Sequence, residues 1–421
     1  MSKRRYQSKE FKSVDWSEVD QRIESERVVV AVDVAKEDFV ATVLDGAQEA
    51  LVTFKWRHPQ DTAEVLACVL SLGKGRRLEA VLEPSGTYGD VLVWQLRQAG
   101  VALYRVSPKR VHDAAEIFDG VPSLHDAKAA YLIGRLHLQG ISQAWQEPSE
   151  ERRELKAIQA RLSVCKGREQ AACNRLEAHL SRHWPEILCI LPLGSATLAV
   201  LIGAYGDPAS VAAEPSAAEE LMRRTGRPGL SEEKIQAVLD SAQNSLGVVP
   251  VGPERALLQW LANDSLAAHQ EVAQVEREIE QRLAHDTLLA ILAMVIGKVS
   301  AAVLLASAGS PLDYPNAASY LKALGLNLKE RSSGKHKGQL KITKRGPSLA
   351  RFYLYFAALR LIVRDPLVKR WYQLKSNRPG AMKNKIVIAL MRKLAKALWH
   401  SARGARFDTN KLFNLKTLAG A

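Results

Sequence analysis

The sequence predicts an α/β domain followed by a region that is almost entirely helical. Between residues 27 and 140, apolar β-branched runs alternate with amphipathic stretches, which is typical of strands and helices in turn. From Glu147 the pattern changes: residues 148–183 have few glycines, and their apolar spacing is helical. The chain has 421 residues, more than one hydrophobic core usually organises, so two or three domains are expected.

The elements of the first domain follow from the local pattern. We expect strands at 27–34, 39–44 and 50–56, a helix at 61–72, a strand at 78–82, a helix at 89–98, a strand at 101–106 and a helix at 108–118. This order is that of the three-layer ribonuclease-H-like fold. The pattern alone leaves other three-layer α/β folds open.

The second region contains two long stretches of helical periodicity with dense charge of both signs, at 148–183 and 253–285. Each is long enough for a coiled-coil arm, and two helices of one bundle explain the pattern equally well.

An internal repeat separates the two stretches. Residues 191–208 resemble residues 293–311, with Gly194 matching Gly297 and Pro208 matching Pro311. Each unit is an apolar helix, a glycine turn and a second apolar helix, as in helix-hairpin-helix elements that contact phosphates. A plain core hairpin is an equally good interpretation. The predicted domains are therefore a basic tail (1–26), the α/β domain (27–145), a helical arm region with the first hairpin unit (146–290) and a basic helical domain (291–421).

Positive charge is concentrated at the C-terminal end. The chain has a formal net charge of +14, and residues 321–421 contain 24 Lys and Arg against three acids. A block this basic that also carries Trp371, Tyr372 and Trp399 is expected to bind a polyanion. A merely solubilising surface is disfavoured, because such surfaces interleave both signs.

The remaining composition predicts a soluble, cytoplasmic protein without a membrane partner. No window approaches the ~18 apolar residues of a membrane helix, and the basic start lacks the apolar run of a secretion signal. The four cysteines have no spacing suited to zinc and are expected to be reduced.

Three carboxylates lie at the ends of predicted elements. Asp33 ends the apolar strand in VVVAVD, Glu83 ends the strand in AVLE, and Asp126 stands at the start of an Ala-rich helix. A carboxylate at the end of a buried strand is costly unless it is solvated or binds a cation. Each acid alone would be explained as a cap or turn residue, whereas the three in this order favour a Mg²⁺ (or Mn²⁺) site for phosphodiester chemistry.

With these segments the chain resembles the transposases of insertion sequence family 110. The matching pieces are VAVDVAKE, LEPSGTYG and HDAKAAYLIGRL, followed between residues 296 and 351 by GKVSAAVLLA, YLKALGL, RSSGK and ITKRGP. The resemblance covers most of residues 27–140 and 290–400. It implies a RuvC-like Asp-Glu-Asp-Asp domain joined through helical arms to a C-terminal transposase domain that bears a nucleophilic serine.

The resemblance also implies an activity and partners. The enzyme would cleave donor and target DNA through a covalent serine–DNA link, exchange the strands, and rejoin them through a junction intermediate. A structured non-coding bridge RNA would select the sites. The active form would be a homodimer or tetramer, working at the nucleoid in the bacterial cytoplasm.

One acidic position departs from the family pattern. The family usually has D-x-x-D at the start of the Ala-rich helix, and the first of these places is Ser123 here. A serine is a weak neutral ligand, so we expect Asp119, across the 120–122 turn, to supply the missing carboxylate. His125 is a less suitable substitute.

The stretch RSSGKHKG carries the candidate nucleophile. A serine that attacks a phosphodiester needs flexibility and nearby cations, and a Ser-Gly step in a basic loop offers both. From the residues alone, a loop that merely contacts phosphate is favoured. The resemblance selects Ser333, with Ser332 as second choice. Contacts to nucleic acid are expected from Arg331, Lys335, Lys337, Lys341, Lys344, Arg345 and Arg351.

Two other functions fit the same sequence. A RuvC-like junction-resolving nuclease would use the acidic site with water as nucleophile, and a non-catalytic relative would only bind nucleic acid. A covalent protein–DNA adduct distinguishes the transposase from the nuclease, and metal-dependent cleavage distinguishes both from a binding protein.

Overall fold

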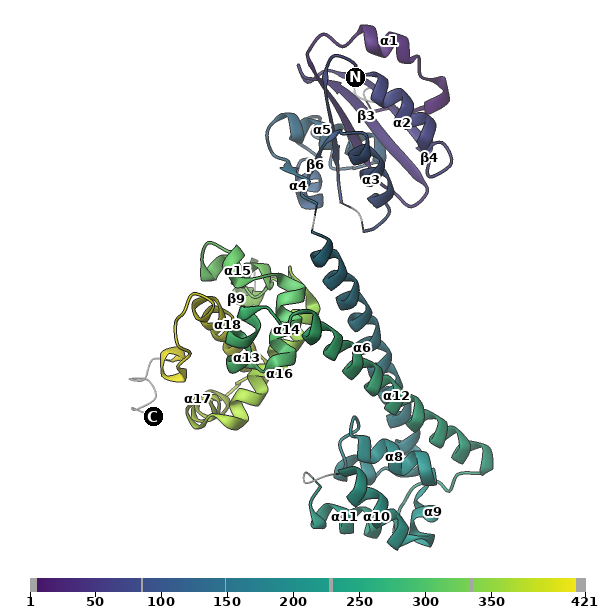
Figure 1. The fold of residues 1–421 in the computed structure, drawn as a ribbon, viewed down its shortest axis with the longest axis vertical. Coiled ribbons are helices and arrows are strands. Elements are labelled where there is room, and N and C mark those ends of the chain that lie inside the picture. Colours follow the sequence, from purple (N-terminus) through teal and green to yellow (C-terminus); the bar gives the residue numbers. More distant parts are fainter. Residues whose placement is uncertain (1–5, 85, 148, 227–229, 334–335, 414–421) are drawn as a thin grey trace. The chain divides into compact units, whose positions relative to one another are not determined.

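The chain divides into two compact units, Met1–Glu147 and Pro148–Ala421, in the computed structural model (Figure 1). The structure describes residues 6–84, 86–147, 149–226, 230–333 and 336–413, with the backbone alone for residues 331–333, 336, 337 and 339. Each unit is described by itself.

The first unit is built on a seven-stranded mixed sheet. Its strands are β1 (Lys9–Glu10), β2 (Arg27–Asp33), β3 (Asp38–Asp45), β4 (Ala50–Arg57), β5 (Arg77–Leu82), β6 (Ala102–Arg105) and β7 (Gln143–Ala144). The order across the sheet is β1-β4-β3-β2-β5-β6-β7. Strands β2, β5 and β6 are parallel neighbours, whereas β3 is antiparallel to β2 and β4. The strands predicted between residues 27 and 106 are thereby confirmed, and the topology is compatible with a ribonuclease-H-like domain.

Helices cover both faces of this sheet. They are α1 (Trp16–Gln21), α2 (Thr62–Ser71), α3 (Asp90–Gln98), α4 (Pro108–Asp113) and α5 (Asp126–Leu138). Successive residues of β2 alternate between two cores: Val28, Val30 and Val32 pack with α2 and α3, whereas Val29 and Ala31 pack with α4 and α5. This alternation, which follows from the two-residue period of a strand, gives three layers.

The N-terminal residues differ from the predicted basic tail over 1–26. Strand β1 pairs in parallel with β4, and a short 3-10 turn (Phe11–Ser13) and α1 follow it. The side chains of Phe11, Val14, Val19 and Ile23 are buried in the core that contains α2 and α3. These scattered apolar residues outweigh the local basic charge, because burying them stabilises the packed state.

The second unit is organised around an antiparallel pair of long helices, α6 (Glu150–His183) and α12 (Gly252–Arg282). Ion pairs at heptad spacing join them: Arg161–Glu278 at 3.0 Å, Arg168–Glu271 at 2.8 Å and Arg175–Asp264 at 3.5 Å. Because the partners advance by seven residues on both helices, the pairing is a coiled coil in one fixed register.

Two helical lobes pack on this coiled coil. The first contains α7 (Ile187–Ile190), α8 (Ala196–Tyr205), α9 (Pro208–Ala213), α10 (Pro215–Gly226) and α11 (Glu232–Gln243). Its core joins Trp184, Leu201 and Leu258, so it includes the beginning of α12 and the end of α6.

The second lobe contains α13 (Thr287–Ile296), α14 (Lys298–Ala308), α15 (Ala317–Ala323), α16 (Ser348–Arg364), α17 (Pro366–Ser376) and α18 (Lys383–Ser401). It also holds the hairpin of β8 (Leu328–Ser333) and β9 (His336–Ile342) and 3-10 turns at Pro311–Asp313 and Thr409–Leu412. Its core includes Leu162 of α6 and Val275 of α12. Among the described residues, no helix is both long enough and apolar enough to cross a bilayer.

The two repeated segments, 191–208 and 293–311, are most similar in structure at their C-terminal ends. Gly206 and Gly309 end α8 and α14, and each is followed by a capped turn that starts with proline. The glycine turns themselves differ, because Gly297 joins α13 to α14 with φ of +85°, whereas α7 is only four residues long. Helices α8 and α14 are largely buried in the cores of their lobes, which supports the interpretation of the repeat as core hairpins.

Candidate active site

Two of the predicted carboxylates end neighbouring parallel strands. Val32 of β2 pairs with Leu82 of β5, so the residues that follow them, Asp33 and Glu83, lie next to each other at one edge of the sheet. Both side chains belong to the face that α5 covers, since residues two positions earlier on each strand pack there. The acids therefore meet at one edge and on one face of the sheet.

Helix α5 brings the third carboxylate to this edge. Helix α5 packs against β2 and β3, and Gly134 allows a close approach, because an added Cβ would lie 2.3 Å from Leu44 Cδ1 and 3.0 Å from Ala31 Cβ. Asp126 is the first residue of the helix, where the partial positive charge of the helix N-terminus favours a carboxylate.

The electrostatics show that the three acids are close enough to interact. Burial, together with the negative charges of Glu83 and Asp126, raises the pKa of Asp33 from 3.8 to about 6. Burial also raises the pKa of Glu83. Three like charges held together in a half-buried place destabilise the ionised forms, and a cation bound among them would offset this cost.

The donor set fits a divalent metal ion by its chemistry. Carboxylate oxygens are the ligands that Mg²⁺ and Mn²⁺ prefer, and two of the three acids are half-buried. In the described part of the chain, no three His, Cys, Asp or Glu side chains are arranged closely enough to hold one ion together. If a metal ion binds here, Asp33, Glu83 and Asp126 are the residues that would hold it.

The fourth position differs from expectation. Asp119 forms an ion pair with Lys128, whose Nζ lies 2.9 Å from both carboxylate oxygens; the Lys128 side chain is buried and Asp119 is half-buried. Its carboxylate also accepts the backbone N–H of Val121, and the partners together keep the pKa of Asp119 low. The carboxylate is therefore occupied by a lysine, which argues against the metal-ligand role that we expected for Asp119.

Ser123 lies outside the helix. Helix α5 begins at Asp126 with His125 as the residue before it, so the helical i, i+3 relation between Ser123 and Asp126 is not formed. Ser123 is exposed, and the His125 ring contacts Tyr6 edge-on with ring centroids 6.1 Å apart. Ser123 therefore does not lie one helical turn before Asp126 on α5.

A second polar cluster, which the sequence did not predict, anchors the other end of α5. Glu79 of β5 is fully buried, and its carboxylate accepts from Arg27 Nε at 2.8 Å and lies 2.8 Å from His137 Nε2. His137 Nδ1 lies 2.6 Å from Ser142 Oγ. The sequence signal for this cluster was Glu79, a charged residue inside the otherwise apolar strand predicted at 78–82. The cluster fixes the register of α5 on the sheet and hence the place of Asp126.

The serine stretch forms a β-hairpin rather than the predicted loop. Ser332 and Ser333 lie at the end of β8, and Ser333 pairs with His336 across the turn. Only the short alternation in residues 340–342 (LKI) was a signal for the second strand. The side chains of both serines and of Arg331 and Lys337, and all of Lys335, lie outside the described part of the structure.

The remaining predicted contact residues surround a tight turn after β9. Lys341, Lys344 and Arg345 are exposed to solvent. Arg351 is engaged within the protein, because its Nη1 donates to the carbonyls of Gly346 at 2.7 Å and Leu324 at 3.3 Å. Three of these four cations are therefore available to a polyanion, and Arg351 stabilises the turn that presents them.

Comparisons with known proteins identify the family of the chain. Residues 30–185 match the family model of IS110-type DEDD transposases, described as "Transposase", and residues 293–373 match the "Transposase IS116/IS110/IS902 family". The first match contains the three carboxylates at the sheet edge, and the second contains the serine hairpin. A DEDD transposase domain indicates dependence on a divalent metal.

Individual relatives give the same assignment. The chain is 24% identical over 389 residues to the insertion element IS900 uncharacterized 42 kDa protein of Mycobacterium paratuberculosis, covering 89% of this chain and 96% of that one. It is 31% identical over 155 residues to the "Probable family 20 transposase" of Pseudomonas aeruginosa, covering 35% and 45%. It is 23% identical over 267 residues to the insertion element IS110 uncharacterized 43.6 kDa protein of Streptomyces coelicolor, covering 61% and 66%.

Two domain models of the same family match in succession along the chain, and a relative from an insertion element aligns over most of its length. The chain therefore belongs to the IS110 family of transposases and is a DNA transposase.

Proposed function

We propose that this transposase cleaves and rejoins strands of donor and target DNA with a metal-dependent RuvC-like site formed by Asp33, Glu83 and Asp126, acting with Ser333 as nucleophile. The observation that carries the proposal is the gathering of three mutually repelling carboxylates on one face at one sheet edge. A structural cap would not place Glu83 and Asp126 where their charges raise the cost of ionising Asp33.

The metal, Mg²⁺ or Mn²⁺, would supply positive charge to the phosphate group as negative charge develops on it. The three carboxylates would hold the ion, and the half-buried positions of Asp33 and Glu83 would limit competing water. Ser333 Oγ would attack the phosphorus atom and form a serine–phosphate ester, while the displaced DNA oxygen leaves as a hydroxyl. The reverse attack, by a hydroxyl of the other strand, would release the serine and restore a DNA phosphodiester.

A guide RNA and an oligomeric assembly complete the proposal. The basic block at residues 321–421 supports a polyanionic partner but does not distinguish RNA from DNA. We propose a structured non-coding bridge RNA and a homodimer or tetramer on the strength of the family resemblance. Purification of the chain after expression with its native flanking DNA, followed by sequencing of bound RNA, tests the first. Light scattering of the complex tests the second.

The nucleophile is tested by a denaturing gel of protein incubated with Mg²⁺, guide RNA and labelled DNA. Ser333→Ala should abolish the covalent adduct and leave nucleic-acid binding nearly unchanged, because many phosphate contacts supply the affinity. Ser332→Ala is the matched control and should retain the adduct.

Two outcomes would contradict the assignment. An adduct that persists in Ser333→Ala and disappears in Ser332→Ala would move the role by one residue. Metal-dependent cleavage by the wild type without any adduct would support the water-using junction nuclease.

A further inference from the structure

The last described residues of the chain fold back along α18. Arg403 fixes the end of this helix, because its guanidinium stacks on the Trp399 ring at 3.8 Å and donates to the carbonyl of Tyr314 at 2.9 Å. The chain then returns, so that Lys393 Nζ donates to the carbonyl of Leu412 at 2.5 Å. Residues 374–413 lie outside both family matches, so neither match assigns a role to this segment.

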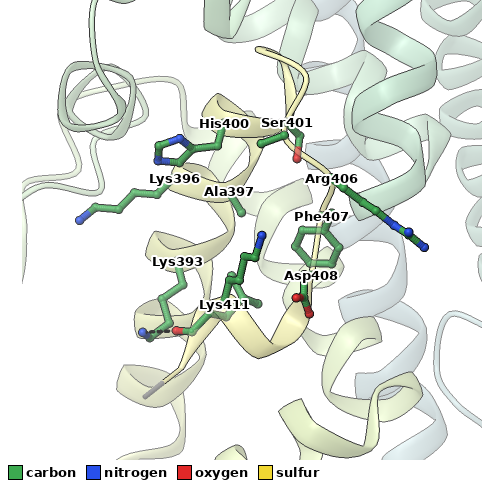
Figure 2. A pocket seen from close by; sticks show the side chains of 11 residues that line it. Lys393, Lys396, Ala397, His400, Ser401, Arg406, Phe407, Asp408 and Lys411 are labelled. Carbon is green, nitrogen blue, oxygen red and sulfur yellow. Dashed lines mark hydrogen bonds between the residues drawn. The ribbon is translucent and has the colours of Figure 1, made fainter. Parts of the chain in front are cut away.

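The returning segment creates a hollow of about 520 Å³ against α18, lined by side chains from both (Figure 2). A second hollow of about 570 Å³ lies between the end of α17 and the first half of α18. Lys393 lines both hollows. Sites of about 300–1,000 Å³ are large enough to enclose a small molecule, so neither hollow is merely a flat charged patch.

The two hollows follow one face of α18. Residues 382, 386, 389, 393, 397 and 400 line them and recur every three or four positions, the spacing of a single helix face. At about 1.5 Å per residue this face is roughly 27 Å long. The hollows are therefore consecutive places on one track.

The track is strongly cationic and lacks internal neutralisation. Seven Lys or Arg residues line it, against one acid: Lys375, Arg378, Lys385, Lys393, Lys396, Arg406 and Lys411 face Asp408 alone. In the described part of the chain, none of the seven lies within 4.0 Å of a carboxylate oxygen. Burial and the charges of Lys396, Lys375 and Arg392 lower the pKa of Lys393. Bound phosphates would relieve this repulsion.

Apolar side chains also line both hollows, beside the cations. Phe407 and Ala397 line the first hollow, and Trp371, Ile386 and Ala389 line the second. A ligand with phosphates on one side and flat apolar rings on the other matches this combination. In a duplex the faces of the bases are stacked inside and only their edges and the backbone are exposed, whereas unpaired nucleotides can place a base in each hollow.

We propose that the two hollows bind unpaired nucleotides of one single-stranded nucleic acid, with phosphates on the lysine and arginine side chains and a base in each hollow. The choice of a nucleic acid as the polyanion rests on the proposed function. The site is separate from the acidic sheet edge and from the serine hairpin. An unpaired stretch of RNA and a displaced DNA strand share this chemistry.

The test is fluorescence anisotropy of the full-length chain with labelled oligonucleotides of about eight nucleotides, a length typical of single-strand sites. There are three probes: a single-stranded RNA, a single-stranded DNA, and a duplex that contains the same sequence within a longer one. Lys396→Gln/Arg406→Gln removes two exposed cations from the first hollow. Lys369→Gln/Arg370→Gln removes two exposed cations of α17 that line neither hollow, and serves as the matched control.

We expect the Lys396/Arg406 variant to bind a single strand about tenfold more weakly, with the slope of log K against log salt reduced by about 1.4, that is, ~0.7 for each lost phosphate contact. The control should change single-strand binding less than twofold. Tighter binding of the RNA or of the DNA strand identifies the natural source. Circular dichroism confirms that each variant folds.

A filling variant separates shape from charge. Ala405 is exposed and lines the first hollow, so Ala405→Trp should weaken single-strand binding and leave duplex binding and the salt slope unchanged. The proposal is overturned if this variant binds single strands like the wild type, or if the Lys396/Arg406 variant behaves like its control. Asp33→Asn, which disables the proposed chemistry, should bind the same probes normally, so the two proposals fail independently.

Discussion

Neutralising Asp33 should abolish recombination and at the same time stabilise the metal-free protein. Asn has the same shape as Asp and can keep the hydrogen bond to the backbone of Val34. It removes the negative charge that burial, Glu83 and Asp126 make unfavourable. Loss of activity with a gain in stability is the expected signature of a metal site, because its ligands repel one another until the ion binds.

The magnitude follows from the pKa of Asp33, which rises from 3.8 to about 6 in the folded chain. Each pKa unit corresponds to about 1.4 kcal/mol, so the ionised carboxylate would cost ~3 kcal/mol without solvent. Asp33 is half-buried, and solvent screening reduces this to roughly 1.5 kcal/mol. Because the folded pKa lies above the unfolded one, the cost is absent below pH 3.8, grows between pH 3.8 and 6, and is complete above pH 6.

The assay is urea unfolding of wild type and Asp33→Asn in EDTA at pH 8 and pH 4, beside a recombination assay with Mg²⁺. The variant should be about 1.5 kcal/mol more stable than the wild type at pH 8, and the two proteins should be nearly equal in stability at pH 4. Adding Mg²⁺ should raise the unfolding temperature of the wild type and not that of the variant. Asp38→Asn, at an exposed position at the start of β3, is the matched control and should change neither property.

Two results would refute this reasoning. Full recombination by Asp33→Asn would remove the residue from the metal site. A loss of about 1 kcal/mol at pH 8, instead of a gain, would identify Asp33 as a capping residue.

Three further predictions concern the framework of the site and the coiled coil. Gly134→Ala should cost about 1–3 kcal/mol in urea unfolding and slow recombination, because the new methyl group pushes α5 away from the sheet; an unchanged unfolding midpoint would contradict the close packing. Asp119→Asn should lower the free energy of unfolding, because buried Lys128 then keeps the carbonyl of Val121 and loses its negative partner, whereas normal stability with lost activity would restore Asp119 as a metal ligand. Arg168→Glu should lower the free energy of unfolding by less than ~1 kcal/mol, and adding Glu271→Arg should restore it. If the double variant is not restored, the pair does not set the register.

Much of the first unit could be predicted from the sequence, because its elements are encoded locally. The alternation of apolar residues along 27–34 and 78–82 sets the strands and the faces of their side chains. Strand direction then places Asp33 and Glu83 at the same edge. That step needs only the rule that parallel neighbours end together, which is why these two acids could be identified without coordinates.

The pairing of distant residues could not be predicted in this way. Asp119 was a plausible ligand by its distance along the chain, yet Lys128, nine residues later, takes its carboxylate. The basic arginines and acidic partners of the two arms recur every seven residues in the sequence, but their register depends on how the lobes pack at each end. Such pairs form because burial makes an unpartnered charge costly, and burial is a property of the whole fold.

The sequence by itself determined the succession of strands along the chain from residue 27 to 106, the acids at their ends and the basic character of the last hundred residues. Each of these features depends on neighbours in the chain. Tertiary structure alone decided that Lys9–Glu10 join the sheet and residues 11–23 pack beside it, that the serines lie on a hairpin, and that the chain after Arg403 folds back along α18. The physical reason is that these features depend on contacts between segments far apart in the sequence, where packing outweighs local preference.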